Sequence, residues 1–398
     1  MTSAQECPDL SRRSATRQRG LSRRSVLAGL GVLGAAGVGV GLLRGGGSGP
    51  AFEPIGGKIV VNGLDTSTID MGYINKMVQG GAHCVHKTIS HEERFALQSY
   101  EDIQAFADDN RDAVAVAKSV ADIRRAYAEG KVSIVMGSQR GRPYLNETLV
   151  NDGPFASYEV LVDKLDDYHA RGLRIQSIAY NVTNALGGGC LDNDVPLTVP
   201  GRRFVEELHK RRIVLDVGGH VGERTTLEAI EASSGIPVIA THTNIEALNP
   251  NIRADSDRVL EAIAGTGGCI GITAISDFHM RNPSNADEHG PKSPRATLDI
   301  HLDQYDYLKR LVGIDHVALG PDFISGWVEY FPMPHNDNLT FPEHSMSSGT
   351  ARLVENFEDI SMLPNVIAGL RERGWTSAEL DKLLGDNLLR VYEQVWGA

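Results

Sequence analysis

Two histidines and one aspartate have the residue types and the order of a hydrolytic metal site. His220, His242 and Asp322 each stand just beyond a β-rich run of the sequence. Imidazoles from neighbouring strands can share one divalent cation, and a carboxylate on a later strand can accept the proton of a metal-bound water. A lone histidine at a strand end is more often a hydrogen-bonded structural residue. The ordered set of three favours the metal site.

Other polar residues also follow predicted strands, and one of them lies in an alternating run. In His83-Cys84-Val85-His86, strand alternation places Cys84 and His86 on one face and His83 on the other. His86 is then either an additional metal ligand or proton carrier at the site, or a residue that packs and hydrogen bonds against a loop. The other strand-end residues are Asn62, Asp65, Lys87, Ser138, Gln139, Arg140, Tyr180, Asn181 and Asn184.

The elements that must position these residues alternate along the chain. Eight β-rich runs are separated by amphipathic stretches, which predicts an α/β fold, a closed parallel (β/α)8 TIM-like barrel with extra C-terminal helices at 356–396. An open doubly wound sheet is the alternative, but no GxGxxG follows the first run. In such barrels the site forms where the strands end. The predicted strands are Lys58–Asn62, Ala82–Ile89, Val132–Met136, Ile175–Tyr180, Ile213–Val217, Val238–Thr241, Cys269–Thr273 and His316–Gly320, and the predicted helices include Tyr158–Ala170, Arg202–Lys210, Thr225–Ala232, Ser256–Ala264 and Leu298–Leu311.

Length and charge narrow the class of protein. The 398 residues include 41% apolar and 23% charged residues, which is ordinary for a globular protein. The net charge of −12 argues against nucleic acid as a partner. The four cysteines, Cys7, Cys84, Cys190 and Cys269, include no CxxC pair, which argues against a structural zinc knuckle.

The first 44 residues have the features of an export leader. Arginines precede an uncharged, Gly-rich run from Val26 to Leu43, and Ser22-Arg23-Arg24-Ser25-Val26-Leu27 resembles a twin-arginine signal. The run is weakly hydrophobic for a membrane helix, so we expect export by the twin-arginine machinery to the periplasm or cell envelope. A permanent N-terminal anchor stays open, because no clear Ala-x-Ala cleavage site follows. We interpret residues 45–56 as a linker and 57–398 as one barrel domain.

Four longer stretches resemble the membrane dipeptidases, the renal dipeptidase-like metallopeptidases of the amidohydrolase superfamily. They are PVIATHTNIEAL (Pro237–Leu248), RADSDRVLEAIAGTGGCIGI (Arg253–Ile272), VGIDHVALGPDF (Val312–Phe323) and LLGDNLLRVYEQV (Leu383–Val395). The resemblance covers most of the chain from about Gly57. It implies a barrel fold, a dipeptide substrate and a binuclear zinc site.

The resemblance assigns roles to four residues that match the family's motifs. His220 and His242 match the two histidines that hold the second zinc ion, and Asp322 matches the aspartate that handles protons. Arg253 matches an arginine that binds the substrate carboxylate, with a structural ion pair to a nearby aspartate as the alternative. The segment Asp216–His220 departs from the family by one extra residue between the aspartate and the histidine.

The other half of the family's metal site is replaced. Leu64 and Thr66 stand where the resemblance implies a histidine and an aspartate, and Gln139 stands where it implies the glutamate that bridges the two metals. Two neighbouring Zn²⁺ ions would then repel each other with no anion between them. We therefore expect one zinc ion at most, unless a strand bulge brings Asp65 into register. Tyr180 replaces a histidine that contacts the substrate carbonyl.

The sequence therefore predicts an exported, zinc-dependent hydrolase that cleaves an amide bond of a small, carboxylate-bearing, dipeptide-like substrate. The metal would lower the pKa of its bound water toward ~7. The alternatives are a catalytically inactive ligand- or partner-binding protein, or a changed reaction such as a lyase or a non-peptide hydrolase. A homodimer stays open. The expected site residues are Asp322 and Tyr180 for catalysis, His220, His242, Gln139 and His86 for the metal, and Arg253 and Asn181 for the substrate.

Overall fold

The computed structural model describes most of the predicted barrel domain. The described residues are 57–89, 93–141, 158–280, 295–324 and 353–397. The predicted leader at 1–44 and the linker at 45–56 lie outside them. Within the described residues, no helix is both long and apolar enough to cross a membrane.

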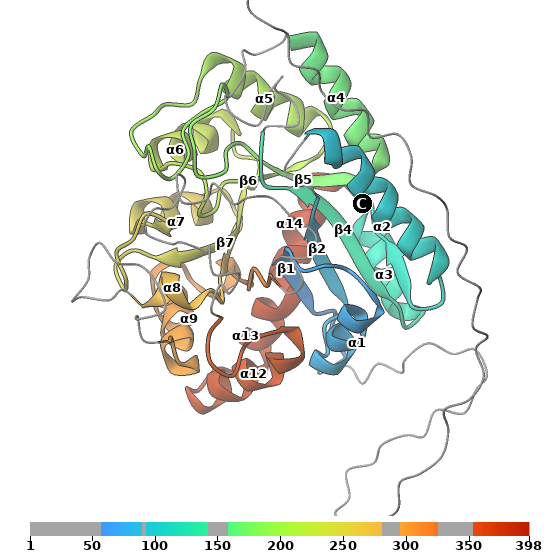
Figure 1. Ribbon diagram of the computed structural model, residues 1–398. Helices are drawn as coiled ribbons and strands as arrows, with labels where there is room; N and C mark the ends of the chain where they lie inside the picture. The colour runs from blue at the N-terminus through green and yellow to red at the C-terminus, as the bar shows by residue number, and fades with distance from the viewer. Residues whose placement is uncertain (1–56, 90–92, 142–157, 281–294, 325–352, 398) are drawn as a thin grey trace, which may run out of the picture. The chain divides into compact units, whose positions relative to one another are not determined.

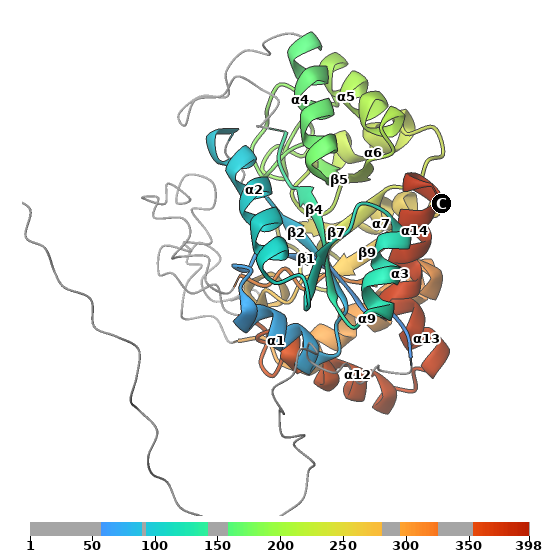
Figure 2. The same ribbon diagram turned by 90° about the vertical axis from the view of Figure 1, so that its right-hand side faces the viewer.

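Eight parallel strands form the ring that the sequence predicts (Figures 1 and 2). Neighbours pair in the order β1-β2-β4-β5-β6-β7-β9-β10. Between the two ends of this order, the Thr66 amide donates to the Phe323 carbonyl oxygen at 2.8 Å. The Asp322 amide likewise donates to the Leu64 carbonyl oxygen at 3.1 Å, so the (β/α)8 prediction is confirmed. The strands are β1 (Val61–Asp65), β2 (Cys84–Thr88), β4 (Val132–Ser138), β5 (Leu173–Ser177), β6 (Val214–Asp216), β7 (Ile239–Ile245), β9 (Cys269–Ile272) and β10 (Val317–Leu319), with β3 (Val114–Val116) beside β4 and β8 (Ala254–Asp255) beside β7.

Helices surround the ring, and short polar side chains begin several of them (Figure 1). The Asp70 side chain accepts the Tyr73 amide at 2.7 Å ahead of α1. Thr198 accepts the Gly201 amide at 3.0 Å ahead of α5. Such caps satisfy amides that the first helical turn leaves without a partner. The helices are α1 (Met71–Gly80), α2 (Glu93–Asp109), α3 (Val120–Ala128), α4 (Tyr158–Arg171), α5 (Val199–Lys210), α6 (Glu223–Ala232), α7 (Asp257–Gly265), α8 (Ser276–His279), α9 (Leu298–Val312), α12 (Leu363–Glu372), α13 (Ser377–Asp381) and α14 (Asn387–Trp396), with short turns η2 (Ile314–His316), η4 (Ile360–Met362) and η5 (Lys382–Asp386).

The C-terminal helix α14 packs against the beginnings of the strands. Val61, Cys84 and Ile239, near the starts of their strands, form one buried cluster with Leu388 and Tyr392 of α14. The predicted tail helices therefore lie outside the strand ring, and α14 covers its N-terminal end. The polar residues singled out in the sequence stand at the opposite end, where the strands finish.

Candidate active site

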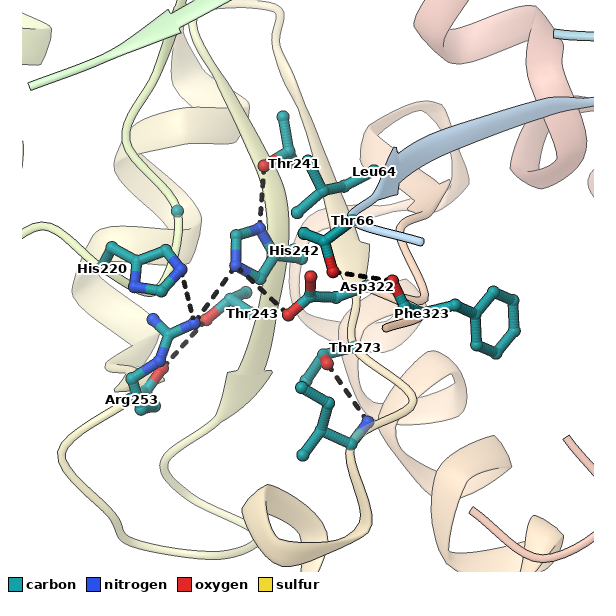
Figure 3. Close-up of polar contacts among 12 residues, drawn as sticks. Leu64, Thr66, His220, Thr241, His242, Thr243, Arg253, Thr273, Asp322 and Phe323 are labelled. Atoms are coloured by element: carbon teal, nitrogen blue, oxygen red, sulfur yellow. Dashed lines mark hydrogen bonds and ion pairs between the residues drawn. The ribbon is translucent and has the colours of Figure 1, made fainter. Parts of the chain in front are cut away.

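The side chain of Arg253 lies between the two predicted metal-binding histidines (Figure 3). His220 follows β6, His242 lies within β7, and Arg253 precedes β8. The Nη2 atom of Arg253 is 3.1 Å from Nε2 of His220 and 3.1 Å from Nε2 of His242. All three residues are buried. The imidazoles converge as the sequence predicts, but the group between them is a guanidinium.

Hydrogen bonds fix the protonation of both imidazoles. Nδ1 of His220 lies 2.6 Å from Oδ1 of Asn181, which only accepts, so this nitrogen carries the proton. The Thr241 hydroxyl donates to Asp216 at 2.7 Å and therefore accepts from Nδ1 of His242 at 2.9 Å. Both Nε2 atoms consequently present a lone pair to Nη2. Metal-binding histidines have the same tautomer and the same kind of outer partner.

Arg253 is held firmly but keeps one donor free. Its amide donates to the Asn251 side chain at 2.9 Å, and its guanidinium carbon lies 5.2 Å from the centre of the Phe278 ring. Its Nη1 atom is buried and has no hydrogen-bond partner among the described residues. The charge of Arg253 acts on the buried Asp255, lowering its pKa against the effect of burial, so the substrate-binding role of Arg253 and its structural alternative both stay predictions.

Asp322 and His242 lie side by side in the buried part of the site. Oδ2 of Asp322 lies 3.8 Å from Nε2 of His242. Burial raises the pKa of Asp322 to about 8 against the opposing charge of Arg253, so this carboxyl group is mostly protonated at neutral pH. Burial, Arg253 and His86 hold the pKa of His242 well below its ordinary value, which keeps its ring neutral. A mostly protonated carboxyl group and a neutral imidazole thus lie side by side.

Tyr180 and Asn181 both contact His220. The Tyr180 ring stacks on the His220 ring with 3.7 Å between centroids, and the Arg140 guanidinium lies 4.1 Å from the Tyr180 ring centre. Asn181 orients His220 through its side-chain oxygen, and its Nδ2 atom is buried with no partner among the described residues. The catalytic role of Tyr180 and the substrate-binding role of Asn181 stay predictions.

His86 points inward, as alternation predicts, but it does not reach the histidine pair as a ligand. Cys84 lies in the interior cluster, whereas the His83 ring meets the Tyr127 ring of α3 edge-on. Nδ1 of His86 donates to the Gly63 carbonyl oxygen at 2.8 Å, since a carbonyl oxygen only accepts, and burial lowers the pKa of His86 to about 4. A Cβ atom on Gly137 would lie only 2.0 Å from Nε2 of His86, so this ring requires a glycine beside it.

The segment at the end of β1 is used for hydrogen bonding within the fold. The pairing of β1 with β2 shifts register between Asn62 and Asp65. This irregularity lies where the sequence allowed a strand bulge that could bring Asp65 into register with the metal site. The Asp65 carboxylate nevertheless accepts from the Tyr73 hydroxyl at 2.8 Å and the Ser67 amide at 2.8 Å. The Thr66 hydroxyl donates to the Phe323 carbonyl oxygen at 2.8 Å. The Asp65 carboxylate is thus engaged within the fold and is not presented to His220 and His242.

The donor set therefore does not fit the family's metal centre. A zinc site needs at least three protein ligands. In the part of the chain that the structure describes, no group of three or more His, Cys, Asp or Glu side chains is placed to hold a metal ion. Leu64 is buried and apolar, and Nε2 of the buried Gln139 has no described partner. The expected single zinc ion on His220 and His242 stays a prediction.

Sequence reasoning gave no role to two residues that shape the site, Asp216 and Lys87. Asp216 fixes the tautomer of His242 through Thr241. Lys87 donates to the Thr66 carbonyl oxygen at 2.8 Å, and burial lowers the pKa of Lys87 to about 8 although Asp65 and Asp322 oppose the shift. Lys87 was noticed only as a strand-end residue, since its contact with β1 depends on how neighbouring strands are staggered.

Comparison with known proteins finds relatives over most of the chain. A family model described as membrane dipeptidase (Peptidase family M19) matches residues 75–343 and 345–397. An uncharacterized protein in the pqqA 5′ region of Klebsiella pneumoniae is 30% identical over 58% of this chain and 76% of its own length. Dipeptidase tcpJ of Claviceps purpurea is 25% identical over 76% of this chain and 60% of its own length. The crystal structure of an amidohydrolase from Pseudomonas aeruginosa matches with a TM-score of 0.72 at 26% identity, covering 86% of this chain and 97% of that one.

Proposed function

The chain belongs to the membrane dipeptidase family, peptidase family M19, and on that premise we propose that it hydrolyses an amide bond near the carboxylate of a small, dipeptide-like substrate. The family is one of metal-dependent hydrolases. The observation that carries the proposal is the buried guanidinium of Arg253 beside the acid of Asp322. A cation that fixes the substrate and a group that exchanges protons then lie at one strand-end site.

Arg253 recognises the substrate carboxylate in this proposal. One of its terminal nitrogens is engaged by the two imidazoles, and the other, Nη1, has no described partner. A buried donor without a partner costs free energy, and a substrate oxygen would remove that cost. A guanidinium also presents a rigid fork that a lysine does not reproduce.

Proton transfer is assigned to Asp322, whose Oδ2 lies 3.8 Å from Nε2 of His242. In its ionised form, the Asp322 carboxylate takes a proton from the water that attacks the scissile carbonyl and then gives that proton to the leaving nitrogen. Tyr180 is the proposed hydrogen-bond donor to the oxyanion that develops on the carbonyl. This mechanism uses no metal ion, because the donor set among the described residues does not fit one.

The proposal includes export. Residues 1–44, with Arg23-Arg24, support passage through the twin-arginine machinery to the periplasm or cell envelope. These residues lie outside the described part of the chain.

Replacement of Arg253 by lysine tests the proposed function. We expect Arg253→Lys to lower kcat/KM for a dipeptide with a free C-terminal carboxylate by roughly tenfold to a hundredfold, the worth of a charged hydrogen bond. Its C-terminally amidated counterpart should be a poor substrate for both proteins and should change little. Arg258→Lys, at an exposed position on α7, is the matched control. Equal losses on both substrates would make Arg253 structural and would remove the carboxylate from the proposal.

A second candidate function follows from the guanidinium between the histidines. A site whose imidazoles bind an internal cation could recognise a small carboxylate ligand without turning it over. Calorimetric binding of a dipeptide that stays intact after long incubation would favour this ligand-binding protein over the hydrolase.

A further inference from the structure

We infer that the guanidinium of Arg253 permanently occupies the place of the metal ion in this site, so that His220 and His242 bind an internal cation instead of zinc. This inference rests on the site proposed above, but it concerns what the site contains and not which bond it cleaves. It also accounts for the disagreement between the family's metal centre and the residues that this chain presents.

The first support is the match between donors and lone pairs. The terminal amino group of Arg253 has two N–H bonds, and it lies 3.1 Å from each of two unprotonated imidazole nitrogens. A zinc ion bound by both nitrogens would use the same two lone pairs, at about 2.1 Å. Because those lone pairs point at Nη2, the ion and the guanidinium exclude each other by position and by charge.

The second support is space that the backbone provides for the guanidinium. Gly219 has a left-handed backbone with φ +50, and a Cβ atom there would lie 2.6 Å from Nη1 of Arg253. The same atom would lie 2.9 Å from the His242 carbonyl oxygen. Gly219 belongs to the segment that carries one residue more than the family pattern between Asp216 and His220. The turn with the extra residue therefore provides the space that the Arg253 guanidinium occupies.

The third support is the charge on the other side of the site. Lys87 contacts the Thr66 carbonyl oxygen at 2.8 Å, at the end of the strand where the family places ligands of its first metal. The positive charges of Arg253 and Lys87 both act on Asp322, opposing the effect of its burial. Two side-chain cations therefore supply fixed positive charge that acts on Asp322. Lys87 comes from β2, and Arg253 comes from the loop before β8.

Zinc binding by the full chain tests the inference independently of catalysis. We would dialyse wild type, Arg253→Met and Arg253→Met/His242→Ala against Zn²⁺ alone, measure bound zinc per chain, and record Tm with and without a chelator. Wild type should hold far less than one zinc ion, with a Tm that neither zinc nor chelator changes. Arg253→Met should bind zinc at least tenfold more tightly than wild type and gain a zinc-dependent rise in Tm. The second substitution should abolish both.

Two further variants separate the position of the cation from its charge. Arg253→Lys retains a cation at the imidazoles and should stay zinc-free. Lys87→Met removes the other, partly buried cation without freeing an imidazole, and it should also stay zinc-free. Stoichiometric zinc in wild type that disappears in His242→Ala would overturn the inference, even if the arginine variants fail to fold. Zinc-free Arg253→Met that folds would overturn it too. Failure to hydrolyse any dipeptide would contradict the proposed function alone.

Discussion

Asp322 adopts a left-handed backbone conformation at the point where the ring of strands is completed. Its φ is 56°, a value that aspartate and asparagine tolerate better than most residues. Its amide donates to the Leu64 carbonyl oxygen at 3.1 Å, so the neighbouring strand holds this conformation in place. The fold thus fixes the backbone that carries the acid, and it buries the acid beside His242.

Asparagine at position 322 separates the effect of proton transfer on catalysis from the effect of side-chain geometry. Asp322→Asn keeps the size of the side chain and its tolerance of positive φ, but it can neither release nor take up the catalytic proton. We expect kcat on the true substrate to fall by ~10²–10⁴-fold, while Tm stays close to that of wild type. Steady-state kinetics and a thermal melt measure the two effects. Unchanged kcat would move the proton-transfer role elsewhere, with His86 as the next residue to test.

For individual residues, the sequence predicted well which side chains come together at the site. It predicted their contacts within the site less well. Histidines after neighbouring parallel strands must converge, and His220 and His242 do. That Arg253 enters between them depends on the turn at Gly219 and on the loop before β8, and neither leaves a periodic signal. Asp65 shows the same limit, because only the bulge in β1 decides which partners its carboxylate finds.

At the scale of helices and strands, the burial of polar residues explains why one predicted strand boundary differs from the structure. All eight ring strands were predicted, but β1 lies at Val61–Asp65 and not at 58–62. The predicted strand ended at Asn62, whereas Asn62 and Asp65 are both buried and the Asn62 side-chain amide donates to the Asp65 carboxylate at 2.8 Å. The strands β3 and β8 are too short to show alternation and were not predicted. Helix α4 was predicted to within one residue because its apolar positions repeat along one face.

A buried glutamate links helices α4 and α5. Glu207 of α5 accepts hydrogen bonds from the Tyr158 hydroxyl of α4 and from Lys210 and Arg211. Burial alone would raise the pKa of Glu207, but these donors outweigh it and lower that pKa from 4.5 to about 2. A carboxylate with a lowered pKa in the folded state stabilises the fold above pH 4.5, and the contribution is lost as pH falls toward 2.

Removing the charge of Glu207 should therefore matter at neutral pH and not in acid. We expect Glu207→Gln to lower the free energy of unfolding by about 1–2 kcal/mol at pH 7, after allowance for solvent screening. The difference from wild type should shrink as pH falls through 4.5 toward 2. Urea unfolding at several pH values measures it, with the exposed Glu206→Gln on the same helix as the control. A difference that is constant with pH would show that packing, and not the charge, is responsible.

At the scale of the whole molecule, the site depends on both ends of the barrel domain. Residues 64–66 of the first strand region bond to residues 322 and 323 after the last strand. Helix α14 then packs on the starts of the strands, where the Asn387 side chain donates to the Val317 carbonyl oxygen at 2.8 Å. Alternating strands and helices predicted the ring, but an amphipathic tail gives no signal for which surface it covers. The ring and its cover form only after nearly the whole chain is made.

This late assembly is compatible with the proposed twin-arginine export, which carries folded protein, and the proposed leader gives the last prediction. Arg23-Arg24 precede a weakly hydrophobic, Gly-rich run, as twin-arginine signals require. Replacing both with lysine keeps the charge but removes the paired guanidinium groups, so we expect the double variant to stay folded in the cytoplasm. Cell fractionation with immunoblotting measures its distribution, and Arg12→Lys/Arg13→Lys in the same leader is the matched control. If the Arg23/Arg24 variant still reaches the periplasm or envelope in wild-type amounts, another export route carries this protein.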